Sequence, residues 1–151
     1  MDWESFIKKY IWDDDKTPYF VSVHALTKYQ ASHELFAYTL FIGVIFSMIA
    51  IFSLTENAPH GVSRIMAFYA FTVASSAVVF GVTKHVLAAC YFALAPLATL
   101  GYFLFWGFPP NLATIDKAFL VAITLGLQVY SLRVVAIAKA YPTMPDKAKD
   151  Q

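Results

Sequence analysis

The sequence predicts an all-α fold, an integral membrane four-helix bundle preceded by amphipathic N-terminal interfacial segments. Three observations predict it. Only 14% of the 151 residues are charged, whereas a soluble domain usually carries about 25%. Hydrophobic residues make up 59% of the chain, and the mean hydropathy is +0.58. Long uncharged stretches separate the few ionised side chains. The composition therefore argues against a soluble globular domain, a disordered chain and a nucleic-acid-binding protein.

Residues 1–33 are expected to form an interfacial arm. Aromatic and aliphatic residues recur there at helical spacing, at Trp3, Phe6, Ile7, Tyr10 and Ile11. After a break at Pro18, a second weakly amphipathic stretch leads into the first span. Such segments lie along a membrane surface with their rings at headgroup level. The arm therefore either rests on lipid or docks a partner subunit. Acidic residues at the N-terminus, where a secretory signal has basic ones, predict no cleavable leader.

Four membrane spans are predicted from the distances between charged residues. Crossing roughly 30 Å of hydrocarbon takes about 20 mainly apolar residues. Between Glu34 and Glu56 lie 21 uncharged residues, which is enough for one span. The same measurement gives three more, with Pro109-Pro110 taken as a helix stop. The fourth is the shortest and is complete only if Arg133 extends its side chain towards the interface. The spans cover about residues 35–55, 65–83, 86–108 and 117–138 of a helical domain over residues 34–139.

Orientation is predicted from the positions of Lys and Arg. Four spans place both termini on one side, where nine Lys and Arg residues fall, and only Arg64 and Lys117 fall on the other. Because basic loops stay in the cytoplasm, both termini are expected there. The membrane is expected to be a bacterial inner membrane or a eukaryotic organelle membrane such as the endoplasmic reticulum. The polar tail, residues 140–151, contains Lys147 and Lys149, which resemble a dilysine signal for retrieval to that organelle.

Five polar residues are predicted to meet at the cytoplasmic boundary of the spans, and these are His33, Glu34, Lys84, His85 and Arg133. Arg133 is the one ionised residue well inside a span, and Glu34 is the nearby acid. An ion pair or a shared polar pocket is therefore expected between them. The cluster is either a set of interfacial side chains that meet water and headgroups or a ligand site. No cofactor or metal is predicted, but His33 and His85 remain an alternative pair of ligands for haem or a metal.

Helix packing is predicted from the small and polar residues inside the spans. The second span carries one stripe of small residues, at Ala67, Ala70, Ala74, Ala77 and Gly81. Small residues let helices approach closely in lipid, either within this chain or against another subunit. Gln128 can donate and accept hydrogen bonds and is expected to join helices. Pro96 is expected to kink the third span. The single cysteine, Cys90, excludes an intrachain disulfide.

The predicted function is that of a non-catalytic accessory, assembly or scaffold subunit of a larger membrane protein complex. The spans contain no mid-span carboxylate and no nucleophile with an adjacent base, so no catalytic residue is assigned. The expected partners are the lipid bilayer and other membrane subunits or a second copy of the chain, but not nucleic acid. Two alternatives stay open. One is a small membrane enzyme or a cofactor- or lipophilic-ligand-binding protein, acting at the cytoplasmic interface through His33, Glu34, His85 and Arg133. The other is an oligomeric channel or carrier.

Overall fold

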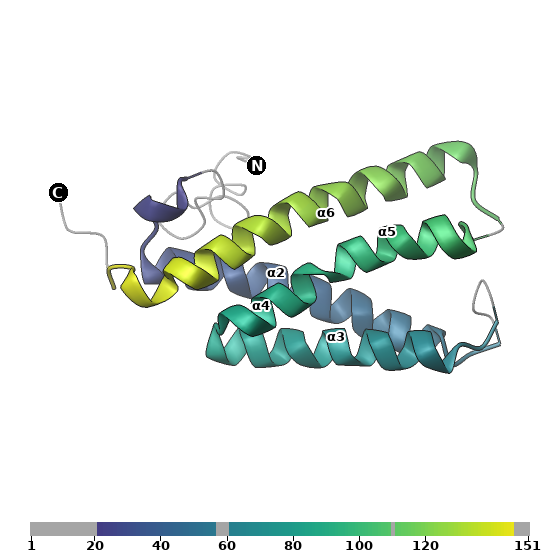
Figure 1. Ribbon diagram of the computed structural model, residues 1–151, viewed down its shortest axis with the longest axis horizontal. Helices are drawn as coiled ribbons and strands as arrows, with labels where there is room; N and C mark the ends of the chain where they lie inside the picture. The colour runs from purple at the N-terminus through teal and green to yellow at the C-terminus, as the bar shows by residue number, and fades with distance from the viewer. Residues whose placement is uncertain (1–20, 57–60, 110, 147–151) are drawn as a thin grey trace, which may run out of the picture.

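The computed structural model describes residues 21–56, 61–109 and 111–146, and all regular structure within these ranges is helical (Figure 1). The elements are the 3-10 helix η1 (Val23–Ala25), the α-helices α2 (Lys28–Phe52), α3 (Arg64–Thr83), α4 (Val86–Ala93), α5 (Ala95–Trp106) and α6 (Thr114–Ala140), and the 3-10 helix η2 (Tyr141–Thr143). Of the arm predicted over residues 1–33, residues 1–20 lie outside the described residues, as do Lys147 and Lys149 of the dilysine-like tail.

Four helical segments are long and apolar enough to cross a membrane. They contain 25, 20, 21 and 30 residues and correspond to α2, to α3, to α4 with α5, and to α6 with η2. At about 1.5 Å of rise per residue, the shortest spans roughly 30 Å, which is the thickness of a bilayer core. The four apolar helices that the sequence predicts are therefore present and in the predicted order.

Helix α2 begins at Lys28, seven residues before the predicted start of the first span. Thr27 caps it, because its hydroxyl accepts from the backbone N–H of Gln30 (3.3 Å) and the Gln30 side chain accepts from the N–H of Thr27 (3.1 Å). Glu34, which was expected to mark the end of the span, is instead inside the helix and only 1% exposed. The helix can continue through this residue because its carboxylate has a partner in the protein interior.

The third span is interrupted. Helix α4 ends at Ala93 and α5 begins at Ala95, with Pro96 in its first turn. Proline has no N–H to donate to the carbonyl four residues earlier, so the helical hydrogen bonding cannot continue through this point. The kink expected at Pro96 takes the form of a break at Leu94, two residues before the proline.

The helices form two antiparallel pairs that meet at one end of the molecule and draw apart towards the other (Figure 1). Helix α3 packs along α2, whereas α4 and α5 pack on α6, and α4 also contacts α3. The largest fully buried side chains include Phe80, Phe92, Ile42, Leu35 and Ile137. In α5 the buried residues are confined to its first turn. The core is therefore concentrated at the end where α4 joins the two pairs.

Small residues form the contact between α2 and α3. In the predicted stripe, Ala67, Ala70 and Ala77 are buried, and Ala74 and Gly81 are partly buried. A Cβ atom on Gly43 of α2 would lie 3.7 Å from the Cβ of Ala77. A Cβ on Gly81 would lie 3.4 Å from the methyl group of Thr39. These approaches place Ala77 and Gly81 of the stripe at a contact within this chain.

The described chain starts and ends at the same end of the molecule. The backbone N–H of Lys28 donates to the carbonyl of Pro145 (2.9 Å), and the ammonium of Lys28 pairs with Asp146 (2.9 Å). Nearby, Ser32 and the hydroxyl of Tyr141 are 2.8 Å apart. The segment that follows α6 therefore folds back onto the beginning of α2.

Candidate functional site

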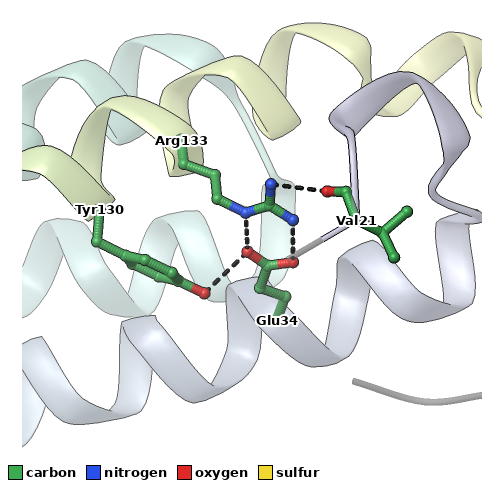
Figure 2. A network of polar contacts seen from close by, with 4 residues as sticks. All are labelled: Val21, Glu34, Tyr130 and Arg133. Carbon is green, nitrogen blue, oxygen red and sulfur yellow. Dashed lines mark hydrogen bonds and ion pairs between the residues drawn. The ribbon is translucent and has the colours of Figure 1, made fainter. Parts of the chain in front are cut away.

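A bidentate ion pair joins α2 to α6. The Nε of Arg133 lies 2.6 Å from Oε1 of Glu34, and Nη2 lies 3.1 Å from Oε2 (Figure 2). The Glu34 side chain is 1% exposed and that of Arg133 is 22% exposed. The structure therefore contains the ion pair that the sequence predicts between these two residues.

Two further groups complete the network. The hydroxyl of Tyr130 donates to Oε1 of Glu34 (2.8 Å), and Nη1 of Arg133 donates to the carbonyl of Val21 (2.8 Å) (Figure 2). The carboxylate thus accepts three hydrogen bonds and the guanidinium donates three. Removing two charges from water is costly, and only good geometry with additional hydrogen bonds offsets that cost. The arrangement suits a fixed joint between α2, α6 and the residues before η1.

The remaining members of the predicted cluster make local contacts. The Nδ1–H of His33 donates to the carbonyl of Tyr29 (2.9 Å), whose ring centroid lies 4.4 Å from that of His33. His85 caps α4, since its Nδ1 accepts from the N–H of Leu87 (3.3 Å). Each of these hydrogen bonds stays within one helical turn. The structure therefore joins Glu34 to Arg133 but shows no contact that joins either histidine to that pair.

Lys84 ends α3 in an unusual backbone conformation. It has a φ of 54°, in the left-handed region that residues other than glycine rarely adopt. Its ammonium donates to the carbonyl of Gly81. Burial lowers the pKa of the Lys84 ammonium, because desolvation disfavours the charged form. Lys84 therefore lies against the end of α3 and not against the Glu34 carboxylate.

The described residues contain no group of three or more His, Cys, Asp or Glu side chains placed to hold a metal ion. The carboxylate of Glu34 is occupied by Arg133 and Tyr130. Cys90 is exposed on α4. Within the described ranges, the Glu34–Arg133 network is therefore the site with the most polar contacts between helices, and its groups are bonded to one another.

A second polar group of residues lies where α4 meets α6. The amide nitrogen of Gln128 donates to the hydroxyl of Ser131 (3.3 Å). That hydroxyl donates to the backbone carbonyl of Gln128 (2.7 Å) and also lies 3.4 Å from the carbonyl of Ala93 on α4. Gln128 was expected to join helices, but its hydrogen bond stays within α6, and Ser131 makes the contact across to α4. The amide oxygen of Gln128 is buried without a hydrogen-bond partner among the described residues.

Sequence reasoning missed two groups of the ion-pair network. Tyr130 precedes Arg133 by three residues, a spacing that places both on one face of a helix. That spacing is a signal from which Tyr130 could have been found. The contact to Val21 uses a backbone carbonyl, which every residue has, so no sequence pattern indicates it. A comparison of the chain with protein-family models, with curated proteins and with solved structures finds no match.

Proposed function

We propose that the chain is an integral membrane protein without catalysis of its own, which serves as an accessory, assembly or scaffold subunit of a larger membrane complex. Membrane insertion is supported by the large apolar side chains on the outside of the helices. Ile65, Leu104 and Phe105 are between 83% and 86% exposed. Apolar surface of this extent is unfavourable in water and is matched by lipid or by other membrane-spanning helices.

The observation that carries the absence of catalysis is the closed Glu34–Arg133 network. A general base needs a lone pair that can reach a substrate, and a metal ligand needs an unoccupied one. The oxygens of Glu34 accept from Arg133 and Tyr130 instead. The network therefore serves as a joint that fixes two helices, which is a structural task.

The α5–α6 pair supports the choice of a subunit role. Beyond the first turn of α5, none of its residues is buried. In α6 the buried residues begin only at Thr124. These outer halves carry a face with few contacts to the rest of the chain and with exposed aromatic residues such as Trp106. A neighbouring subunit that packs there would cover this exposed apolar surface.

Purification in a mild detergent, followed by crosslinking and mass spectrometry, tests the subunit role. Another membrane protein, or a second copy of this chain, is expected to co-purify in fixed ratio. A photo-crosslinking residue in place of Phe105 on α5 is expected to give a protein adduct. The same residue in place of Phe68 on α3, which is 71% exposed, is the matched control. A chain that always runs alone and gives no protein adduct would contradict the proposal.

The proposed orientation has both termini in the cytoplasm, on the basis of the nine basic residues on that side against two. Single cysteines in a Cys90→Ala background test it with a membrane-impermeant maleimide. Glu56→Cys is expected to react in intact cells, whereas Lys139→Cys is expected to react only after permeabilisation. Both positions are exposed, so a failure to react with the maleimide would not be caused by burial of the cysteine within the protein. The reverse labelling pattern would show the opposite orientation.

A further inference from the structure

A groove of about 540 Å³ runs along the outside of the α2–α3 pair. Its lining is apolar except for Thr39 and Ser47, and the hydroxyl of Thr39 already donates to the carbonyl of Leu35 (2.6 Å). Gly43 and Ala77 both line the groove, where their small side chains leave space between the two helices. The groove is therefore an apolar channel on a surface that faces the lipid in the proposed membrane setting.

The groove is long enough for a hydrocarbon chain to lie along both helices. It follows α3 from Ala74 to Val82 and α2 from Phe36 to Ile51, which is about 12 Å and about 22 Å of helix rise. An acyl chain that lies along the two helices would contact apolar side chains of both over this length.

The ammonium of Lys84 is hydrogen-bonded to a residue that lines the groove. Gly81 lines the groove, and its carbonyl accepts a hydrogen bond from the ammonium of Lys84. Among the described residues, the ion pairs are Lys28 with Asp146 and Arg133 with Glu34, and no acid pairs with Lys84. Burial also lowers the pKa of Lys84, as expected for a cation without a nearby anion. The site therefore combines an apolar channel with a positive charge that the described chain leaves uncompensated.

We infer that this groove binds one acyl chain of an anionic membrane phospholipid, with the headgroup phosphate on the ammonium of Lys84. The charge favours an anionic lipid, because a zwitterionic headgroup brings its own cation along with its phosphate, and an apolar helix brings no anion at all. The inference requires membrane insertion and does not depend on the proposed subunit role.

Native mass spectrometry of the detergent-solubilised full chain tests the inference. The probes are phosphatidylglycerol and phosphatidylcholine with identical acyl chains, titrated separately. Lys84→Met removes the charge, and Lys84→Arg keeps it. Lys139→Met is the matched control for the loss of one exposed positive charge elsewhere. Ser47→Phe fills the groove, and Ser75→Phe places the same ring at an exposed position of α3 outside it.

The wild-type chain is expected to bind phosphatidylglycerol more tightly than phosphatidylcholine. Lys84→Met is expected to weaken phosphatidylglycerol binding about fivefold, which corresponds to roughly 1 kcal/mol for one basic side chain near an anionic lipid. Lys84→Arg and Lys139→Met should retain the preference. Ser47→Phe should weaken binding of both lipids, and Ser75→Phe should leave it unchanged.

Three results would overturn the inference. The first is equal binding of the two lipids by the wild-type chain. The second is an equal loss in Lys84→Met and Lys139→Met, which would indicate general surface charge. The third is unchanged lipid binding in Ser47→Phe, which would show that no acyl chain occupies the groove. If Lys84→Met folds poorly, Ser47→Phe still tests the groove, because Ser47 is exposed and its replacement should not disturb folding. Lys84→Arg keeps the charge and still tests the role of the cation.

Discussion

Glu34 is a carboxylate held in an apolar helix by three hydrogen bonds. Two come from the guanidinium of Arg133 and one from the hydroxyl of Tyr130. An unpaired buried charge is strongly unfavourable, whereas a pair with complete hydrogen bonding is tolerated. The hydrogen bonds from Arg133 and Tyr130 therefore make it possible for the Glu34 carboxylate to be buried.

Arg133→Leu is expected to lower the free energy of unfolding by about 3 kcal/mol. The substitution leaves the carboxylate of Glu34, which is 1% exposed, without its cation, and breaking a buried pair typically costs about 3–5 kcal/mol. The measurement is reversible unfolding of the purified protein in detergent micelles. Lys139→Leu removes an exposed cation from the same helix and should change stability by less than about 0.5 kcal/mol.

The double variant Glu34→Leu/Arg133→Leu separates the loss of a contact from the presence of an unpaired charge. Replacing both partners of a buried pair by apolar residues is often neutral or stabilising. The double variant should therefore be more stable than Arg133→Leu alone. Equal stability of the single and double variants would show that the unpaired carboxylate is not the cause of the loss.

Lys84 is expected to make the free energy of unfolding depend on pH in the alkaline range. Its pKa is lowered in the folded state from the ordinary value of 10.5, so between the two values the unfolded chain binds more protons and stability rises with pH. The free energy of unfolding of the wild-type chain should therefore rise relative to Lys84→Met as the pH increases from neutral towards 10.5. The comparison is made in a neutral detergent without anionic lipid. A constant difference between the two proteins would contradict it.

The Glu34–Arg133 contact could be predicted because each residue is the nearest opposite charge for the other in an otherwise apolar setting. Lys84 and His85 could not be excluded from it in the same way. Both were expected at the same depth in the membrane, but depth does not fix the direction in which a side chain points. Their local hydrogen bonds to Gly81 and Leu87 depend on how α3 ends and α4 begins.

At the scale of elements, the close contact between α2 and α3 depends on the small size of the residues between them. Ala77→Leu is expected to lower the free energy of unfolding by about 1–3 kcal/mol, because overpacking a well-filled contact forces backbones apart. Ala77 is 1% exposed, and its Cβ would lie only 3.7 Å from a Cβ on Gly43. Unfolding in detergent provides the measurement. Ala98→Leu, at an exposed position of α5, is the matched control and should be close to neutral.

The positions of the helices were easier to predict than their ends. Pro96 indicated a kink in the third apolar segment, because its missing N–H removes a helical hydrogen bond, and the structure shows a break at Leu94. Helix α2 begins before Glu34, although the uncharged stretch from which the first span was predicted begins after it. A charge marks the end of a span only where it has no partner inside the fold, and the partner here lies on another helix.

At the scale of the whole molecule, the end of the described chain closes the fold where it begins. Met144 is 7% exposed and belongs to the core that includes Leu26 and Ile137. Asp146 makes the nearby ion pair with Lys28, but its side chain is 85% exposed. Burial and charge therefore make separate contributions to this closure.

Met144→Ala is expected to lower the free energy of unfolding by about 2 kcal/mol, since deleting a buried methionine side chain removes apolar contacts and leaves a cavity. Asp146→Asn is expected to cost less than about 0.5 kcal/mol, because exposed ion pairs contribute little. Thermal unfolding of the two variants in the same detergent compares them. A larger loss in Asp146→Asn would show that charge holds the closure together.

The number and order of the apolar helices follow from the sequence, but the divergence of the two pairs does not. In water, a helix buries its apolar face and exposes its polar face, so the pattern indicates the packing. Here Phe68 on the outside of α3 is as apolar as Phe80 in the core, although one is 71% exposed and the other fully buried. Contacts between helices in lipid depend on the shapes of their surfaces and on small residues. A pattern of apolar residues does not predict which helix surfaces fit together.

The separation of Glu34 and Arg133 along the chain also affects how the protein is made. The two residues are 99 positions apart, and ribosomes add about 5–20 residues per second, so Arg133 is synthesised about 5 to 20 seconds after Glu34. During that interval the first apolar helix carries an acid whose cation does not yet exist. The ion pair that joins α2 to α6 can therefore form only after α6 has been synthesised. Until then, the growing chain contains Glu34 but not Arg133, the cation that pairs with it in the finished protein.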